Sequence, residues 1–186
     1  MPGPGPAVTL RRLLDGLYAA AAGLAALSLL SIFVVMIAQI VLREMGRQLP
    51  GADDLSAYLC VATTFLALAA TFRRGEIIRV SMVLNHLRPG PRRAMEILTL
   101  TLAACVMAYV TWWTAQEALF AWEIEEVAQG TVAFPLWVPK LVMPLGAGLL
   151  LVAILDELAA TLRGATPSYV RAAAERAAAG DYTKEP

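Results

Sequence analysis

Residues 16–42 read GLYAAAAGLAALSLLSIFVVMIAQIVL, an apolar run without a charged side chain between Asp15 and Arg43. A helix needs about 20 mostly apolar residues to cross the hydrocarbon core of a bilayer. The run is too long for the apolar region of a cleaved signal peptide, which covers about 7–15 residues. It predicts a first transmembrane helix over about residues 17–42 that also carries the membrane-targeting information.

Two further runs have the length and the apolar character of a span. Residues 55–72 carry no charge at all, and residues 97–116 carry none either. They predict a second span over about residues 55–72 and a third over about residues 95–118.

The fourth run is shorter, because only Leu141 to Leu155 separates Lys140 from the next acidic residue. A run of this length also fits a re-entrant segment. Apolar residues extend it on both sides, however, and the long side chain of Lys140 reaches a membrane surface easily. The sequence therefore predicts a fourth crossing over about residues 138–158.

The composition agrees with this reading. Hydrophobic residues make up 59% of the chain, charged residues make up 16%, and the mean hydropathy is +0.63. A soluble domain has about 45–50% apolar and about 25% charged residues. The expected fold is an all-α membrane protein with one four-helix domain over residues 13–163. The formal net charge is zero, so no global field attracts nucleic acid.

Lys and Arg residues are distributed unevenly among the connections. Of the fifteen in the chain, all but Arg43, Arg47 and Lys140 lie in the leader, in the connection after the second span or in the tail. Because cytoplasmic loops are enriched in Lys and Arg, both termini and the middle connection are expected in the cytoplasm. The leader, residues 1–12, is expected to be disordered, and residues 164–186 form a cytoplasmic tail.

Two connections have a pattern of their own. Apolar residues recur on one helical face between the second and third spans, which predicts a short amphipathic helix in the membrane interface over about residues 76–88. The connection after the third span is instead acidic and lies near four tryptophans. Its acidic residues are Glu117, Glu123, Glu125 and Glu126.

Residues that would support chemistry are scarce in this chain. No charged residue stands at the centre of a predicted span, where an ionisable group would suggest a transport or catalytic site. A single histidine, His86, rules out bis-histidine haem binding within one chain, and no metal-binding or catalytic motif is present. We therefore expect neither an enzyme nor a bound cofactor.

Polar and small residues inside the spans are expected to serve helix packing. Ala19, Ala22, Gly23 and Ala26 form a small-residue face on the first span, and Gly146 with Gly148 forms one on the fourth. Gln39 needs a partner in lipid, and the alternatives are Asp53, Asp54 or another subunit.

Three blocks of sequence carry a resemblance to a known family. They are residues 39–43 (QIVLR) with 53–58 (DDLSAY), residues 73–80 (RRGEIIRV), and residues 135–139 (PLWVP) with 144–146 (PLG). In order and spacing they resemble the small permease subunit of tripartite ATP-independent periplasmic (TRAP) transporters, the DctQ-like family. The chain departs from the family pattern at Gly51, Ile77 and Ser81, and its acidic pair is Asp rather than Glu.

The resemblance implies a subunit of the bacterial inner membrane that braces a large permease subunit beside membrane lipid. In this family the large subunit holds the substrate and sodium sites, and a periplasmic binding protein delivers the substrate, usually an organic acid. Candidate subunit-contact or motif positions are Gln39, Arg43, Asp53, Asp54, Arg74, Gly75, Pro144 and Gly146. A candidate docking rim for the binding protein consists of Glu123, Glu125 and Glu126.

Other functions remain as alternatives. The small subunit of a tripartite tricarboxylate transporter has a similar role. An independent homo-oligomeric carrier would need a buried charge or a broken helix at the membrane midplane. A membrane anchor without a cofactor, serving a redox or enzyme complex, is the third alternative.

Overall fold

The computed structural model describes residues 6–74, 89–130 and 132–163, and this part of the chain is almost entirely helical. Its four helices are α1 (Pro6–Glu44), α2 (Ala52–Arg74), α4 (Pro89–Glu123) and α5 (Trp137–Leu162). All four are long and apolar enough to cross a membrane, which confirms the predicted four-span, all-α fold. The interfacial helix predicted over residues 76–88 lies outside the described residues.

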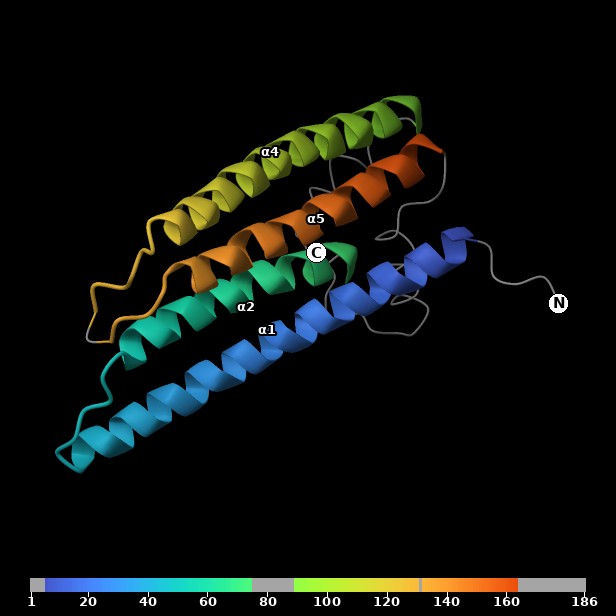
Figure 1. The fold of residues 1–186 in the computed structure, drawn as a ribbon. Coiled ribbons are helices and arrows are strands. Elements are labelled where there is room, and N and C mark those ends of the chain that lie inside the picture. The colour runs from blue at the N-terminus through green and yellow to red at the C-terminus, as the bar shows by residue number, and fades with distance from the viewer. Residues whose placement is uncertain (1–5, 75–88, 131, 164–186) are drawn as a thin grey trace, which may run out of the picture.

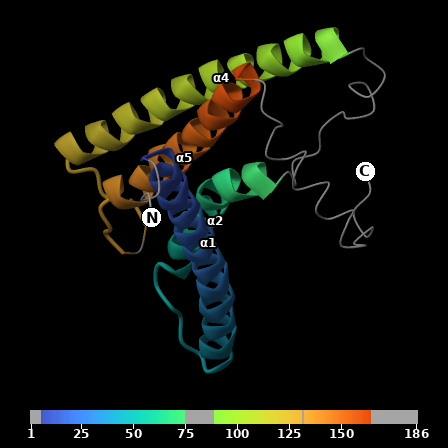
Figure 2. The same ribbon diagram turned by 90° about the vertical axis from the view of Figure 1, so that its right-hand side faces the viewer.

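The helices run alternately up and down and lie side by side in the order α1, α2, α5, α4 (Figure 1). The central pair is α2 and α5, while α1 packs mainly on α2 and α4 packs mainly on α5. Seen from the side, α1 and α4 cross at a steep angle, so that the layer is strongly twisted (Figure 2). This arrangement leaves broad faces of the two edge helices uncovered.

The observed helices extend beyond the predicted spans. Helix α1 has 39 residues and a length of about 58 Å. It begins at Pro6, so that residues 6–12, expected in the disordered leader, are helical. Helix α4 begins at Pro89, and a Pro–Gly–Pro sequence occupies its first turn, where proline is well tolerated because the first N–H groups lack helical partners.

Helix α1 ends in a glycine-dependent cap. Gly46 has a φ of +74°. The Arg47 amide donates to the Leu42 carbonyl at 2.9 Å, and the Gly46 amide donates to the Arg43 carbonyl at 3.0 Å. These two bonds form a Schellman motif, which satisfies carbonyl groups at the helix end and turns the chain toward α2.

One stripe of α1 faces α2. Its less exposed residues recur at alternating intervals of four and three, as in a coiled-coil seam. They are Leu14, Tyr18, Ala21, Ala25, Ser28, Ile32, Val35, Gln39 and Leu42. Of the small-residue face predicted from Ala19, Ala22, Gly23 and Ala26, only Ala22 is half-buried and the others are exposed; a Cβ on Gly23 would meet nothing within 4 Å.

The central helices α2 and α5 are in close backbone contact at Gly146. A Cβ on Gly146 would overlap the backbone carbonyl group of Phe65. Ala69, one helical turn after Phe65 in α2, and Ala147, which follows Gly146 in α5, are both completely buried. Since lipid supplies no hydrophobic drive between helices, small residues that allow close backbone packing stabilise such a pair.

We expect Gly146→Ala to destabilise the protein and Gly148→Ala to leave it as stable or slightly more stable. Both changes gain the same helix propensity, about 1 kcal/mol. At position 146 the added methyl must push α2 and α5 apart, at a cost of about 1–3 kcal/mol, whereas at position 148 it meets only the Thr111 methyl at 3.7 Å. Thermal unfolding of both variants in the same detergent measures the difference. Equal midpoints would show that the close contact does not matter.

Candidate functional site

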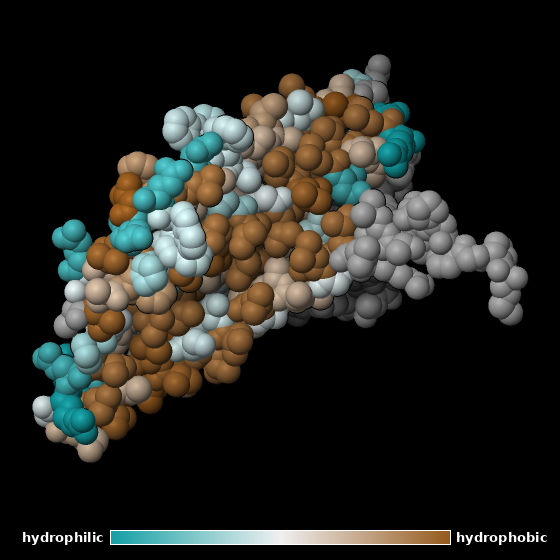
Figure 3. All heavy atoms as spheres, in the orientation of Figure 1, coloured by the Kyte–Doolittle hydropathy of each residue, from teal (hydrophilic) through white to brown (hydrophobic). Residues whose placement is uncertain are grey.

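The charged side chains of the described residues gather at the two ends of the helical layer, while its middle is apolar (Figure 3). At one end lie Lys140, Glu117 and Asp53, and we call it the Lys140 end. At the other lies Arg93 near the end of α5, and we call it the Arg93 end. The candidate residues of the acidic connection lie at the Lys140 end.

Lys140 holds three segments together at this end. Its Nζ atom donates to Glu117 Oε1 at 2.9 Å and to Glu126 Oε2 at 2.6 Å. The Lys140 side chain is 22% exposed, against 62% for Glu117 and 34% for Glu126. Since the three residues belong to α5, α4 and the connection between them, the ion pairs tie the outer turns of both helices to that connection.

The α4–α5 connection is folded rather than extended. Val127 and Pro135 form an isolated antiparallel bridge. The Ala128 amide donates to the Phe134 carbonyl at 2.8 Å, and the Leu136 amide donates to the Glu126 carbonyl at 2.9 Å. These backbone bonds give the described parts of the connection, residues 126–130 and 132–136, a defined shape.

One face of this connection covers the beginning of α2. The Phe134 ring stacks on Tyr58, with ring centroids 6.1 Å apart. A Cβ on Gly130 would clash with the Asp54 carboxylate, so the backbone at Gly130 lies directly against it. The first turn of α2, the α4–α5 connection and Lys140 thus form one continuous surface.

Gln39 reaches the same end from α1. Its Nε2 donates to Asp53 Oδ1 at 3.0 Å, which is the first of the alternatives that the sequence left open. Asp53 stands in the first turn of α2, where a carboxylate also interacts favourably with the helix dipole. The bond joins the C-terminal part of α1 to the first turn of α2.

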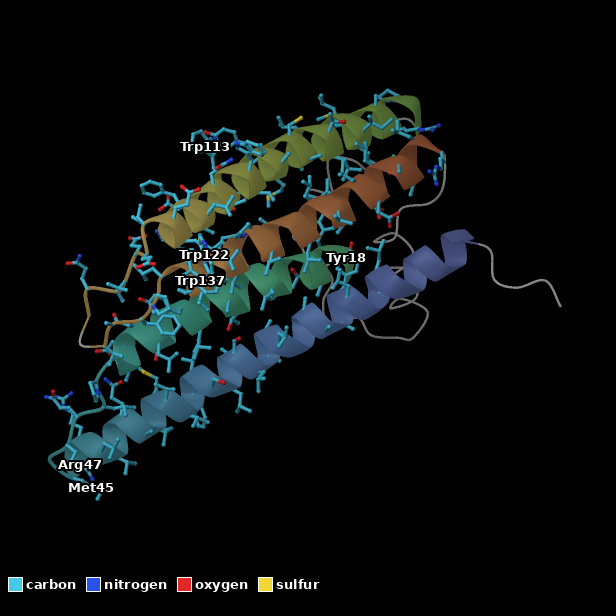
Figure 4. The ribbon with its side chains drawn as sticks, in the orientation of Figure 1. Tyr18, Met45, Arg47, Trp113, Trp122 and Trp137 are labelled. Atoms are coloured by element: carbon cyan, nitrogen blue, oxygen red, sulfur yellow. The ribbon has the colours of Figure 1, made fainter. Side chains whose placement is uncertain are left out.

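Tryptophans mark the Lys140 end, as the sequence predicted (Figure 4). Trp122 of α4 contacts Trp137 of α5 edge to face, with centroids 4.6 Å apart. Trp113 lies further along α4 against Tyr109 at 6.1 Å. Exposed tryptophans at this level are typical of a membrane–water boundary.

The Arg93 end holds a residue that the sequence reasoning missed. Glu157 is only 5% exposed and lies on the buried face of α5 with Leu150, Ala153 and Ile154. The helical spacing of these residues was the signal that could have revealed it. At the same end, Arg93 Nη2 donates to the Thr161 and Leu162 carbonyls at 3.2 and 3.0 Å. These carbonyls lie at the C-terminus of α5, where a positive charge interacts favourably with the helix dipole.

The structure separates the candidate motif positions into groups. Gln39, Asp53 and Asp54 meet at the Lys140 end, where Arg43 is exposed at the end of α1. Gly146 belongs to the α2–α5 contact instead, and Pro144 lies inside α5. The Arg74 side chain and Gly75 lie outside what the structure describes. In the proposed rim, Glu123 and Glu125 are exposed, whereas Glu126 is bound by Lys140.

Cofactor chemistry has few candidates in the described ranges. Within residues 6–74, 89–130 and 132–163 no group of three or more His, Cys, Asp and Glu side chains is placed to hold a metal ion. The two cysteines, Cys60 and Cys105, are free and exposed.

We expect Lys140→Met to lower the free energy of unfolding by about 1 kcal/mol, the upper range for partly exposed ion pairs. The two carboxylates would then face each other without the cation that separates them. Glu123→Gln, which removes an exposed charge from the same region, is the matched control. Thermal unfolding at low and high salt checks this. An effect no larger than that of the control would show that the ion pairs do not stabilise this end.

Comparison with known proteins adds an independent finding. A family model described as "Tripartite ATP-independent periplasmic transporters, DctQ component" matches residues 32–164, from the middle of α1 to just beyond α5. A search of curated proteins gave no match to the chain.

Proposed function

Because the chain belongs to the DctQ family of tripartite ATP-independent periplasmic transporters, we propose that it braces the large permease subunit during sodium-coupled import of an organic acid. A transporter subunit of this family is a multi-pass protein of the inner membrane, in agreement with the four apolar helices. DctQ proteins act together with a large permease and a periplasmic binding protein. The bracing role, the sodium coupling and the class of substrate are the proposed steps.

The open helical layer is the observation that supports a bracing role. Large apolar side chains along α1 remain exposed on the face turned away from α2, among them Leu24, Leu27 and Phe33. A second such face runs along α4 from Leu98 to Phe120. A protein that worked alone would be expected to enclose a polar site between its helices. This layer instead has a tightly packed centre and two edges available to lipid and to a larger membrane partner.

The proposed orientation puts the Arg93 end in the cytoplasm and the Lys140 end in the periplasm. The uneven distribution of Lys and Arg supports it, because only Arg43, Arg47 and Lys140 belong to the connections at the Lys140 end. The positive charge of Lys140 is paired with the carboxylates of Glu117 and Glu126. The remaining charges of the α4–α5 connection are therefore acidic, which makes the proposed periplasmic surface acidic there.

We expect a tagged form of this chain to copurify with the large permease subunit in mild detergent when both are expressed. Deleting this chain should abolish uptake by the otherwise complete transporter, because the large subunit would lose its brace. Affinity purification followed by transport assays in proteoliposomes measures both. If this chain purifies alone, or transports substrate as a homo-oligomer, the proposal is wrong and the independent carrier is favoured.

We also propose that the acidic rim of the connection contacts the binding protein. Glu123 and Glu125 are exposed and free to act through their charge. Glu126 differs from them, because its hydrogen bond to Lys140 makes it a support of the connection. The proposal therefore assigns contact with the binding protein to Glu123 and Glu125 and a supporting role to Glu126.

Replacing Glu123 and Glu125 together by Gln should slow uptake at low concentrations of binding protein and weaken its dependence on salt, because exposed charges act mainly through screened association. Glu126→Gln should instead lower thermal stability. Uptake is measured in proteoliposomes over a range of binding-protein concentrations. Unchanged uptake kinetics in the double variant would contradict a role for the rim.

A further inference from the structure

One stripe of α4 is exposed at the edge of the layer. Leu102, Val106, Tyr109 and Trp113 are each more than half exposed. They recur at intervals of four, three and four residues, which places them on one helical face. Trp113 projects from the side of α4 that is turned away from α5 (Figure 4). We call these four residues the outer seam of α4.

The opposite face of α4 packs on α5. Leu100 and Ala104 belong to one buried cluster with Leu150 and Ile154 of α5. The outer seam begins two residues after Leu100, about 200° further around the helix. It therefore has the spacing of a helix-packing stripe, and the described residues leave it uncovered.

Tyr109 places a hydroxyl group of the outer seam deep inside the membrane. The charge-free run of α4 between Glu96 and Glu117 is about as long as the hydrocarbon core is thick, roughly 30 Å. Tyr109 lies about 12 Å inside Glu117 along the helix axis and about 20 Å inside Glu96. Helical side chains lean toward the N-terminus of their helix, which for α4 is the Glu96 side. The phenol is thus directed away from the nearer membrane surface and toward the midplane.

Lipid cannot satisfy a hydroxyl group at this depth. Acyl chains offer no hydrogen-bond acceptor, and a polar group without a partner in an apolar medium costs free energy. Tyr109 is 66% exposed, and its ring lies 6.1 Å from the Trp113 ring. Its hydroxyl makes no hydrogen bond within residues 6–74, 89–130 and 132–163. An acceptor from another membrane protein would remove this cost.

Other exposed hydroxyl groups of the edge helices are satisfied inside their own helix. Ser28 and Ser31 of α1, and Thr99 and Thr101 of α4, each donate to the carbonyl four residues earlier at 2.7 to 2.9 Å. Tyr109 cannot do the same, because its hydroxyl stands at the far end of a rigid ring. Tyr109 therefore distinguishes the α4 edge from the α1 edge.

We propose that the outer seam of α4 is the contact with the large permease subunit, and that a transmembrane helix of that subunit places a hydrogen-bond acceptor opposite the Tyr109 hydroxyl. The inference rests on the proposed function, which supplies the partner, and it names the edge at which that partner packs. The exposed side chains of α1, such as Leu24, Leu27 and Phe33, are apolar and are assigned to lipid.

The test measures how fast this chain leaves the large subunit in lipid vesicles. Both subunits carry fluorophores for energy transfer, and an excess of unlabelled chain starts the exchange. Tyr109→Phe removes only the hydroxyl oxygen, and we expect it to speed dissociation about three- to tenfold, as for hydrogen bonds between membrane helices. The matched control is Tyr58→Phe, which removes the same atom at the beginning of α2, and we expect it to leave the rate unchanged.

The outcomes separate this inference from the proposed function. If the complex forms but Tyr109→Phe exchanges as the wild type does, the Tyr109 contact is wrong while the bracing role stands. An equal acceleration in Tyr58→Phe also overturns the inference, because it would show a general effect of losing a phenol. If no complex forms with the large subunit, the bracing role fails and the inference fails with it.

A second measurement compares the two edges directly. Tyr109→Cys and Phe33→Cys, each in a background with Cys60→Ser and Cys105→Ser, are labelled with a photoactivatable crosslinker in the complete complex. We expect the label at position 109 to crosslink to the large subunit and the label at position 33 to crosslink to lipid. Crosslinks to the large subunit from position 33 alone would assign the contact to α1 and overturn the proposal. Crosslinks from position 109 only to lipid, or only to a second copy of this chain, would overturn it as well.

Discussion

The close approach of α2 and α5 at Gly146 is the contact on which the rest of the layer depends. Since α1 packs mainly on α2 and α4 packs mainly on α5, the central pair connects the two halves of the molecule. A helix pair in lipid cannot rely on the hydrophobic effect, and it is held by dispersion contacts between closely spaced backbones. Gly146 allows the backbone of α5 to lie against the Phe65 carbonyl, and the small side chains of Ala69 and Ala147 leave room for the two helices to pack closely. The layer is therefore tightly packed between α2 and α5, while broad faces of α1 and α4 remain exposed.

At the Lys140 end the helices and the α4–α5 connection form one defined surface. The Lys140 ion pairs fix the α4–α5 connection, while Phe134 attaches the same connection to α2. The Gln39–Asp53 hydrogen bond brings α1 to this surface as well. Segments that are far apart in sequence thus share one platform, whose shape is set by contacts within this chain.

Some residues of the candidate site were accessible to sequence reasoning and others were not. An amide near the end of an apolar span must find a partner, and the sequence left Asp53, Asp54 or another subunit as alternatives for Gln39. The structure pairs it with Asp53. Three glutamates close together suggested one rim, but the structure binds Glu126 to Lys140 and leaves Glu123 and Glu125 exposed. Glu157 was not singled out, because it stands at the end of the predicted fourth span, away from its centre. Its burial follows from the face of α5 on which it lies.

The sequence by itself determined that this chain has four apolar segments long enough to cross the membrane and that it belongs among the small subunits of TRAP transporters. Both properties are local: span number follows from apolar runs compared with the bilayer thickness, and membership follows from short motifs in order. Only the tertiary structure decided that α2 and α5 form the centre, that Ala21 and Ala25 rather than Gly23 face α2, and that Lys140 binds Glu117 and Glu126. These depend on which faces of different helices meet, and apolar residues on every side of a span leave that choice to packing between distant segments.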